Sequence, residues 1–103
     1  MKASVKLIWS KKAKTSLKGI YLYIKKDSPA AAEKVRLKII LQSEKLLLFP
    51  EKFSEEELLR EVPGNFRSVS IWRYKIVYEI DRDKVVIIDI FDGAQNPDKL
   101  KTK

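Results

Sequence analysis

The strongest constraint on the fold is a two-residue alternation over residues 72–80. Such a period is typical of a half-buried β-strand. Asp81-Arg82-Asp83 then supplies turn residues, and residues 84–91 resume as a β-branched run, so the two runs predict an antiparallel hairpin. We expect one face in the core and Arg73 and Lys75 on the other. The core face carries the even-numbered side chains Trp72, Tyr74, Ile76, Tyr78 and Ile80.

An amphipathic helix is predicted directly after a short first strand at residues 5–9. Ser10 precedes the helix and offers a capping hydroxyl. The apolar residues that follow recur at helical spacing and form one stripe, while most lysines fall on its flanks and on the opposite side. The stripe consists of Ala13, Leu17, Ile20, Tyr21 and Ile24.

A second helix is expected from about Pro29 to Leu48. Asp27-Ser28-Pro29 places a capping side chain before a proline at the first helical position. A short turn between two helices predicts an αα-hairpin. The buried ridge is expected to contain Ala32, Val35, Ile39, Gln42 and Leu46, with Leu41 and Leu48 widening it.

The remaining segments complete the predicted fold. Phe49-Pro50 ends the helical half, and the acidic run at residues 55–57 is expected to be a surface connection or a weak strand entry. Residues 58–62 could begin pairing, residues 63–65 turn, and residues 66–71 start a three-stranded meander, while Asn96-Pro97 could begin one helical turn. The sequence therefore predicts one α+β domain over residues 1–103, in which a β-α-α-β-β-β chain packs a helical hairpin on a small antiparallel sheet.

Several function classes are excluded by missing residue types. The chain has no cysteine and no histidine, so disulfides, thiol chemistry, histidine proton transfer and the commonest metal ligands are absent. The three glycines are too scattered for a phosphate-binding loop, and Asp89 with Asp92 is too small a set to predict a metal site. We expect no cofactor and no metal. No apolar run approaches the roughly 18 residues of a membrane helix, so a soluble, cytoplasmic protein without membrane contact is expected.

The positive charge of the chain is concentrated in its first half. Residues 1–50 hold 12 Lys and Arg against 3 acids, a net +9, whereas residues 51–103 hold 10 against 11, a net −1. This distribution favours an acidic or polyanionic partner, although lysine-rich helices can also serve solubility alone. Lys11, Lys14 and Lys18 are the predicted partner-binding residues.

A basic and aromatic constellation is the candidate for chemistry on nucleic acid. Arg67, Arg73 and Lys75 lie near Trp72, Tyr74 and Tyr78 in the predicted meander. Guanidinium groups match phosphate oxygens, but RNA cleavage by internal attack also needs a base and an acid, which arginines do not supply. The alternative is a solvated strand face for the cations and a core role for the rings. Exposed rings would instead suit single-stranded nucleic acid.

Four segments, in order and spacing, resemble the RelE/ParE toxins of type II toxin–antitoxin modules, often called plasmid stabilization proteins. The segments are IWSKKAKTSLKGIYLYI, SPAAAEKVRLKI, LREVPGNFRSVSIWRYKIVYEI and VVIIDIFDGAQNPDKL. The resemblance covers essentially the whole chain. It implies the same β-α-α-β-β-β fold that the periodicity predicts.

The resemblance implies two alternative targets. RelE-like members cut messenger RNA in the ribosome with sheet lysines and arginines and a C-terminal arginine and tyrosine, whereas ParE-like members inhibit DNA gyrase. Arg67 and Lys75 match basic positions of the RelE-like sheet. Val69 stands where a second basic residue is expected, and residues 93–97 hold no arginine and are followed by no tyrosine. Some relatives use a glutamate base ahead of the sheet, for which Glu57 is the nearest candidate.

The chain therefore resembles ParE-like more than RelE-like toxins. The leading hypothesis is a growth-inhibiting toxin that acts on DNA gyrase and is neutralised by a cognate antitoxin, with DNA contact only through that antitoxin. The antitoxin is expected to cover part of the helical hairpin and the exposed sheet edge. The alternatives are a ribosome-dependent mRNA endoribonuclease (an mRNA interferase) using Arg67, Arg73 and Lys75, and a family member without toxicity.

Overall fold

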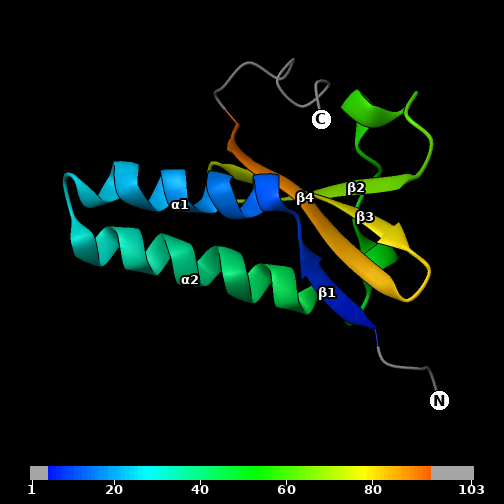
Figure 1. Ribbon diagram of the computed structural model, residues 1–103, viewed down its shortest axis with the longest axis horizontal. Helices are drawn as coiled ribbons and strands as arrows, with labels where there is room; N and C mark the ends of the chain where they lie inside the picture. Colours follow the sequence, from blue (N-terminus) through cyan, green and yellow to red (C-terminus); the bar gives the residue numbers. More distant parts are fainter. Residues whose placement is uncertain (1–4, 94–103) are drawn as a thin grey trace.

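The computed structural model describes residues 5–93 as two helices beside a four-stranded sheet (Figure 1). The elements are β1 (Lys6–Trp9), α1 (Lys11–Lys25), α2 (Pro29–Lys45), the 3₁₀ turns η1 (Pro50–Lys52) and η2 (Glu57–Leu59), β2 (Asn65–Ile71), β3 (Tyr74–Asp81) and β4 (Lys84–Asp92). This order confirms the predicted arrangement. The helical turn expected at Asn96-Pro97 lies outside the described residues. Within residues 5–93, no helix has the length and apolar character needed to cross a membrane.

The sheet is mixed, whereas the sequence predicted an antiparallel one. Its strand order is β1-β4-β3-β2. The meander β2-β3-β4 is antiparallel, but β1 pairs parallel to β4, with Leu7 opposite Val85. The helical hairpin carries the chain from β1 to the far edge of the sheet, and two reversals then bring β4 back beside β1 in the same direction. Local periodicity contains no information on that pairing.

Serine caps begin both helices, as predicted. The Ser10 hydroxyl accepts a hydrogen bond from the Ala13 amide at 3.0 Å, and the Ser28 hydroxyl accepts one from the Ala31 amide at 3.1 Å. Each cap satisfies an amide that lacks a partner in the first turn. The predicted stripe of α1 faces inward: Ala13 is fully buried, and Leu17, Ile20 and Ile24 pack against the core. Figure 1 shows the α1–α2 turn extending beyond the sheet.

The buried face of α2 is narrower than the sequence predicted. The helix ends at Lys45, so Leu48 lies beyond it and is 71% exposed. Leu41 is 54% exposed. Leu41 lies two positions after the buried Ile39, a rotation of roughly 200° about the helix axis, so the two side chains point to nearly opposite sides. The prediction that Leu41 and Leu48 widen the buried face is therefore wrong.

The predicted strand over residues 72–80 is too long at its beginning. Ile71 pairs with Tyr74, so Trp72 and Arg73 form the turn between β2 and β3. Trp72 is 54% exposed and has a positive φ of 54°. The expected core position of Trp72 is wrong. Tyr74, Ile76 and Tyr78 are buried as predicted, and Ile80 is half-buried and packs against the core.

Apolar side chains are buried on both faces of the sheet, although the sequence predicted a solvated outer face. The face toward the helices holds the larger core. On the other face Leu59, Phe66, Val77 and Ile88 form a second cluster beneath η2. The predicted strand at residues 58–62 is absent; instead η2 and a single bridge between Glu55 and Arg67 bring this segment over the sheet. Because this segment covers the outer face of the sheet, Val77 is fully buried although it lies on the face that was expected to be solvated.

Candidate functional site

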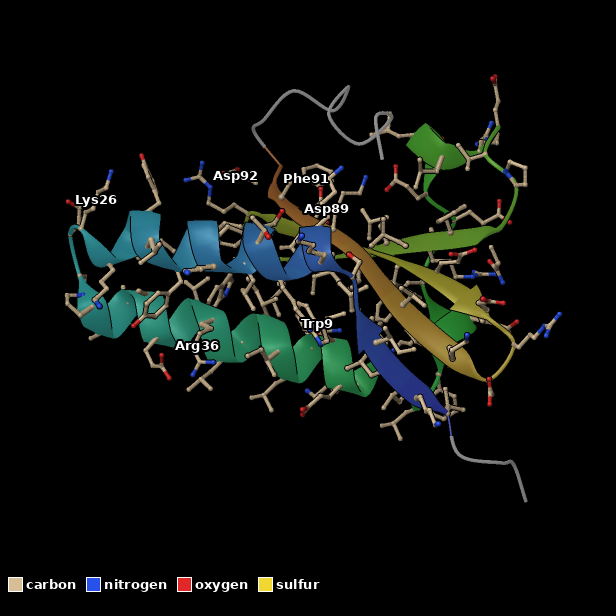
Figure 2. The ribbon with its side chains drawn as sticks, viewed as in Figure 1. Trp9, Lys26, Arg36, Asp89, Phe91 and Asp92 are labelled. Atoms are coloured by element: carbon tan, nitrogen blue, oxygen red, sulfur yellow. The ribbon has the colours of Figure 1, made fainter. Side chains whose placement is uncertain are left out.

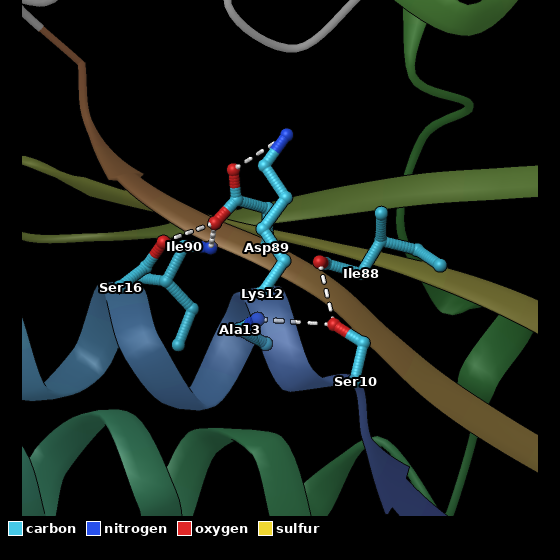
Figure 3. A network of polar contacts seen from close by, with 7 residues as sticks. All are labelled: Ser10, Lys12, Ala13, Ser16, Ile88, Asp89 and Ile90. Atoms are coloured by element: carbon cyan, nitrogen blue, oxygen red, sulfur yellow. Dashed lines mark hydrogen bonds and ion pairs between the residues drawn. The ribbon is translucent and has the colours of Figure 1, made fainter. Parts of the chain in front are cut away.

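A buried aspartate in β4 anchors the start of α1 to the sheet (Figure 3). The pairing of β3 with β4 shifts at Ile88, because Tyr78 lies opposite Ile87 while Val77 lies opposite Asp89. Such a bulge redirects a side chain. Asp89 is 5% exposed; its Oδ1 accepts hydrogen bonds from the Ser16 hydroxyl at 2.6 Å and the Ile90 amide at 2.8 Å.

Two further contacts complete this anchor. The Nζ of Lys12 lies 3.6 Å from Asp89 Oδ2, and the Ser10 hydroxyl donates a hydrogen bond to the Ile88 carbonyl at 2.8 Å. Both oxygens of the Asp89 carboxylate are thus occupied by groups of the protein itself. Within residues 5–93 no cluster of three or more acidic residues is placed to hold a metal ion. The network is a structural anchor for α1.

Arg67 holds the chain segment that follows α2. Its guanidinium donates hydrogen bonds to Asn65 Oδ1 at 3.1 Å, the Glu51 carbonyl at 3.2 Å and the Phe53 carbonyl at 2.7 Å. Opposite Arg67 on β3, the Tyr78 hydroxyl donates to the Pro50 carbonyl at 2.6 Å. Burial raises the pKa of Tyr78 to about 12, while the Arg67 cation acts in the opposite direction. Arg67 therefore serves the packing of residues 50–53 against the edge of the sheet.

Lys75 lies on the opposite face of the sheet, in an ion pair with Glu56. The Lys75 Nζ is 2.6 Å from Glu56 Oε1, and the Glu56 side chain is 1% exposed. Burial acts to raise the pKa of Glu56 and is the largest single influence. Hydrogen bonds from Lys75, the Leu58 amide and Ser68 together outweigh it and hold this pKa below 4.5. The pair ties the segment before η2 to the outer face of β3.

Arg73 occupies a third, separate place, in the turn between β2 and β3. Its Nη2 lies 2.6 Å from Asp92 Oδ2, and its side chain is 63% exposed. Its hydrogen bond to this carboxylate raises the pKa of Arg73 above its ordinary value. A hollow of about 560 Å³ lies beside α1 at the start of β3. Its lining includes Arg73, Asp92, Tyr23, Phe91 and the edge of the buried Tyr74.

The structure does not bring the predicted nuclease residues together. Arg67 shares a face with Tyr78, whereas Lys75, three positions earlier on the same strand as Tyr78, projects from the other face. Glu57 is 81% exposed on its side chain and pairs with Arg60 at 3.4 Å. Its neighbour Glu56, which the sequence did not single out, is the buried carboxylate. The sequence also assigned no structural role to Asp89. Its position as a lone acid within an apolar strand run is a signal for a buried, paired carboxylate.

An apolar groove with a basic rim runs between α1 and α2 and reaches the end of β1. Its volume is about 370 Å³. Figure 2 shows Trp9 at the end of β1 and Arg36 on α2. Of the predicted partner-binding lysines, the exposed Lys14 and Lys18 line the groove, whereas Lys11 is exposed at the start of α1 outside this lining. The lining consists of Trp9, Lys14, Leu17, Lys18, Tyr21, Arg36 and Ile40.

The two sheet edges differ in how far they are covered. β2 is bridged by the preceding segment: the Glu56 amide donates to the Phe66 carbonyl at 2.9 Å, and the Ser68 amide donates to the Ser54 carbonyl at 3.2 Å. Among the described residues, β1 pairs only with β4, so its outer edge has no strand partner. Trp9 connects this open edge with the groove between the helices.

Comparisons with known proteins agree with this architecture. Residues 7–97 match the family model described as the ParE toxin of the type II toxin–antitoxin system parDE. No curated protein sequence matches the chain. Among solved structures, the chain is similar to one described as the chromosomal ParDE TA system from P. aeruginosa, with 24% identity and a TM-score of 0.70 over 85% of this chain and 95% of that chain. The structural likeness supports the fold, and the family match extends over nearly the whole sequence. This chain belongs to the ParE toxin family of type II toxin–antitoxin systems.

Proposed function

We propose that the protein is a toxin that inhibits DNA gyrase by direct protein contact and is neutralised by a cognate ParD-type antitoxin. Membership of the ParE family supports the toxin role. The observation that favours a non-nucleolytic mechanism is the separation of Arg67, Arg73 and Lys75, each engaged by a different partner within the fold. Cleavage of RNA needs a base, an acid and charge stabilisation around one phosphate. A phosphate that meets Lys75 on one face of the sheet is out of reach of Arg67 on the other.

A direct comparison of the two targets tests this proposal. Purified toxin is expected to block negative supercoiling of plasmid DNA by gyrase, and to leave messenger RNA uncut in a translating extract, as judged by primer extension. Toxin premixed with excess antitoxin is the control and should restore supercoiling. Codon-positioned RNA cuts that disappear in Arg73→Ala, a substitution at an exposed turn, would instead favour the ribosome-dependent endoribonuclease.

The groove between the helices and the open edge of β1 form the proposed antitoxin surface. An extended antitoxin segment could add to β1, because strand addition satisfies the unpaired backbone groups of an edge. Apolar antitoxin side chains would fill the groove beside Leu17 and Tyr21. Arg36 is already paired with Glu33 at 2.6 Å. Lys14 and Lys18 have no ion-pair partner within residues 5–93 and supply the remaining positive charge of the rim. An acidic antitoxin segment matches that charge.

Charge reversal in the groove is expected to weaken antitoxin binding. The double variant Lys14→Glu/Lys18→Glu should bind about 10- to 100-fold more weakly at low salt, with a smaller difference at high salt, because rim charges are screened. Titration calorimetry at two ionic strengths measures both effects. Lys45→Glu/Lys52→Glu changes the net charge equally outside the groove lining and serves as the matched control. Equal losses in both double variants would indicate attraction to the whole positive field rather than to this surface.

A further inference from the structure

Trp72 stands at the turn between β2 and β3, where neither the turn nor the core requires a tryptophan. Its φ of 54° belongs to the left-handed region, which is unfavourable for bulky side chains and is commonly occupied by glycine or asparagine in two-residue hairpins. Arg82 adopts a similar φ of 58° in the other hairpin, but a flexible, solvated side chain suits a turn. The Trp72 ring is 54% exposed and belongs to neither apolar cluster. The backbone conformation at residue 72 is therefore unfavourable for a tryptophan, and yet its large ring lies at the surface.

A cation lies beside Trp72, and a second exposed ring lies beside the neighbouring Arg73. The Nζ of Lys38 on α2 lies 6.0 Å from the centroid of the Trp72 ring. Arg73, the next residue of the turn, lines a hollow together with Tyr23 of α1, which is 73% exposed. The Nζ of Lys26 lies 5.8 Å from the Tyr23 ring, and Figure 2 shows Lys26, Phe91 and Asp92 along one side of α1. We call Tyr23, Lys38, Trp72 and Arg73 the turn platform.

Only some of the cations in and beside the turn platform form ion pairs within residues 5–93. Arg73 is paired with Asp92, whereas Lys38 and Lys26 form no ion pair among the described residues and lie near aromatic rings instead. Protein–protein contact centres are typically depleted of lysine and pack their aromatic anchors among apolar neighbours. The turn platform shares its Trp, Tyr and Arg with such centres but differs from them in the lysines that flank its rings. The apolar groove between α1 and α2 lies elsewhere and has different lining residues.

We propose that the turn platform binds single-stranded nucleic acid, with an unpaired base stacked on Trp72 and phosphates contacted by Lys38 and Arg73. Exposed aromatic rings beside cations are the usual means by which proteins hold unpaired bases and their backbone. Tyr23 provides a second ring for a neighbouring base. This contact would be made by the toxin itself, without an antitoxin, and it does not depend on gyrase being the target. Unpaired bases of DNA and of RNA offer the same stacking chemistry.

Fluorescence of Trp72 provides a direct test in the full-length protein. The chain has two tryptophans, so Trp9→Phe leaves Trp72 as the only one. Adding a short oligodeoxythymidine or oligouridine to this variant should quench its emission, and a duplex of equal length should quench it less. The DNA and RNA arms identify the preferred polymer. A failure of both oligonucleotides to quench Trp72 would overturn the proposal.

Substitutions at the turn separate stacking from general charge attraction. Trp72→Gly removes the ring, keeps the charge and relieves the unfavourable φ, so it should melt at the same or a higher temperature. It should nevertheless bind a labelled oligonucleotide roughly 5- to 150-fold more weakly, the range expected for one stacked base. In Trp72→Gly the slope of log affinity against log salt concentration should stay unchanged. In Lys38→Gln this slope should fall by the amount expected for the loss of about one phosphate contact. Trp72→Phe should retain most of the affinity.

Phe49→Ala is the matched control, because Phe49 is a 72% exposed ring that lines a hollow with Lys52, Arg82 and Lys84 around the other hairpin turn. It should leave oligonucleotide affinity within about twofold, since its ring lies outside the turn platform. Equal losses in Phe49→Ala and Trp72→Gly, or unchanged binding in Trp72→Gly, would overturn the proposal. So would an effect of Trp72→Gly on antitoxin binding alone, which would identify the turn platform as a protein contact.

Discussion

Replacing Glu56 by glutamine is expected to destabilise the fold by about 2–4 kcal/mol at neutral pH. The Glu56 side chain is 1% exposed, and its two oxygens meet the Lys75 Nζ at 2.6 Å and the Leu58 amide at 2.9 Å. Glutamine preserves the size of the side chain but leaves the Lys75 charge beneath η2 without an anion. Lys75 is 29% exposed and can reach toward water, which keeps the expected loss below the largest values for buried pairs.

The contribution of Glu56 should depend on pH in a defined direction. Burial acts to raise the pKa of Glu56, but the hydrogen bonds from Lys75, Leu58 and Ser68 lower it below 4.5 on balance. Near this value the unfolded chain binds more protons than the folded one. The stabilisation by Glu56 is therefore complete above about pH 4.5. It is lost as the pH falls through the pKa of Glu56 in the folded protein. Denaturant unfolding at neutral and at acidic pH should show a difference between wild type and Glu56→Gln that shrinks on acidification.

The adjacent glutamate supplies a matched control for this prediction. Glu57 has a side chain that is 81% exposed and forms an ion pair with Arg60 at 3.4 Å. Glu57→Gln is expected to change stability by less than about 0.5 kcal/mol at any pH. A double-mutant cycle with Lys75→Met then isolates the ion pair from the packing of η2. Equal effects of the two glutamate substitutions would contradict a special role for Glu56.

The helices were predictable because their signals are local. Ser10 and Ser28 sit directly before their helices and cap them, and the stripe that begins at Ala13 is buried as its spacing predicts. The mixed sheet was not predictable in this way. The parallel pairing of β1 with β4 joins residues nearly eighty positions apart, and no periodicity within either strand records the direction of its neighbour.

The surroundings of the candidate site residues are determined by tertiary contacts, which local sequence patterns do not reveal. The alternation over residues 72–80 located the core side of Tyr74 and Tyr78 correctly, but it gave no sign that η2 covers the other face and buries Val77. The same alternation continued through Trp72 although the chain turns there. Arg67 and Lys75 are both basic residues of the meander, yet only the β2–β3 register reveals that they project from opposite faces. Charge and residue type alone therefore suggested a constellation that the fold separates.

Asp89→Ala is expected to cost about 3 kcal/mol and to loosen the start of α1 selectively. The substitution leaves the Ser16 hydroxyl and the Ile90 amide without their acceptor in a site where Asp89 is 5% exposed. The Lys12 ion pair adds little, because Lys12 is 41% exposed on its side chain and 3.6 Å away. Asp89→Asn keeps an acceptor oxygen and should cost only about 1 kcal/mol. Asp83→Ala, in the exposed β3–β4 turn, should be nearly neutral.

Hydrogen exchange can show whether this loss is local. In Asp89→Ala the amides of the first two turns of α1 and of residues 88–90 should exchange faster than the global loss of stability explains, whereas the β2–β3 amides should follow the global value. Because the same turns of α1 carry Lys14 and Lys18, antitoxin affinity should also fall, although Asp89 lies outside the groove lining. A uniform increase in exchange across the sheet, with unchanged antitoxin affinity, would mean that Asp89 stabilises the fold as a whole. The predicted pattern instead makes the bulge of β4 the element that holds in place the helix that carries Lys14 and Lys18.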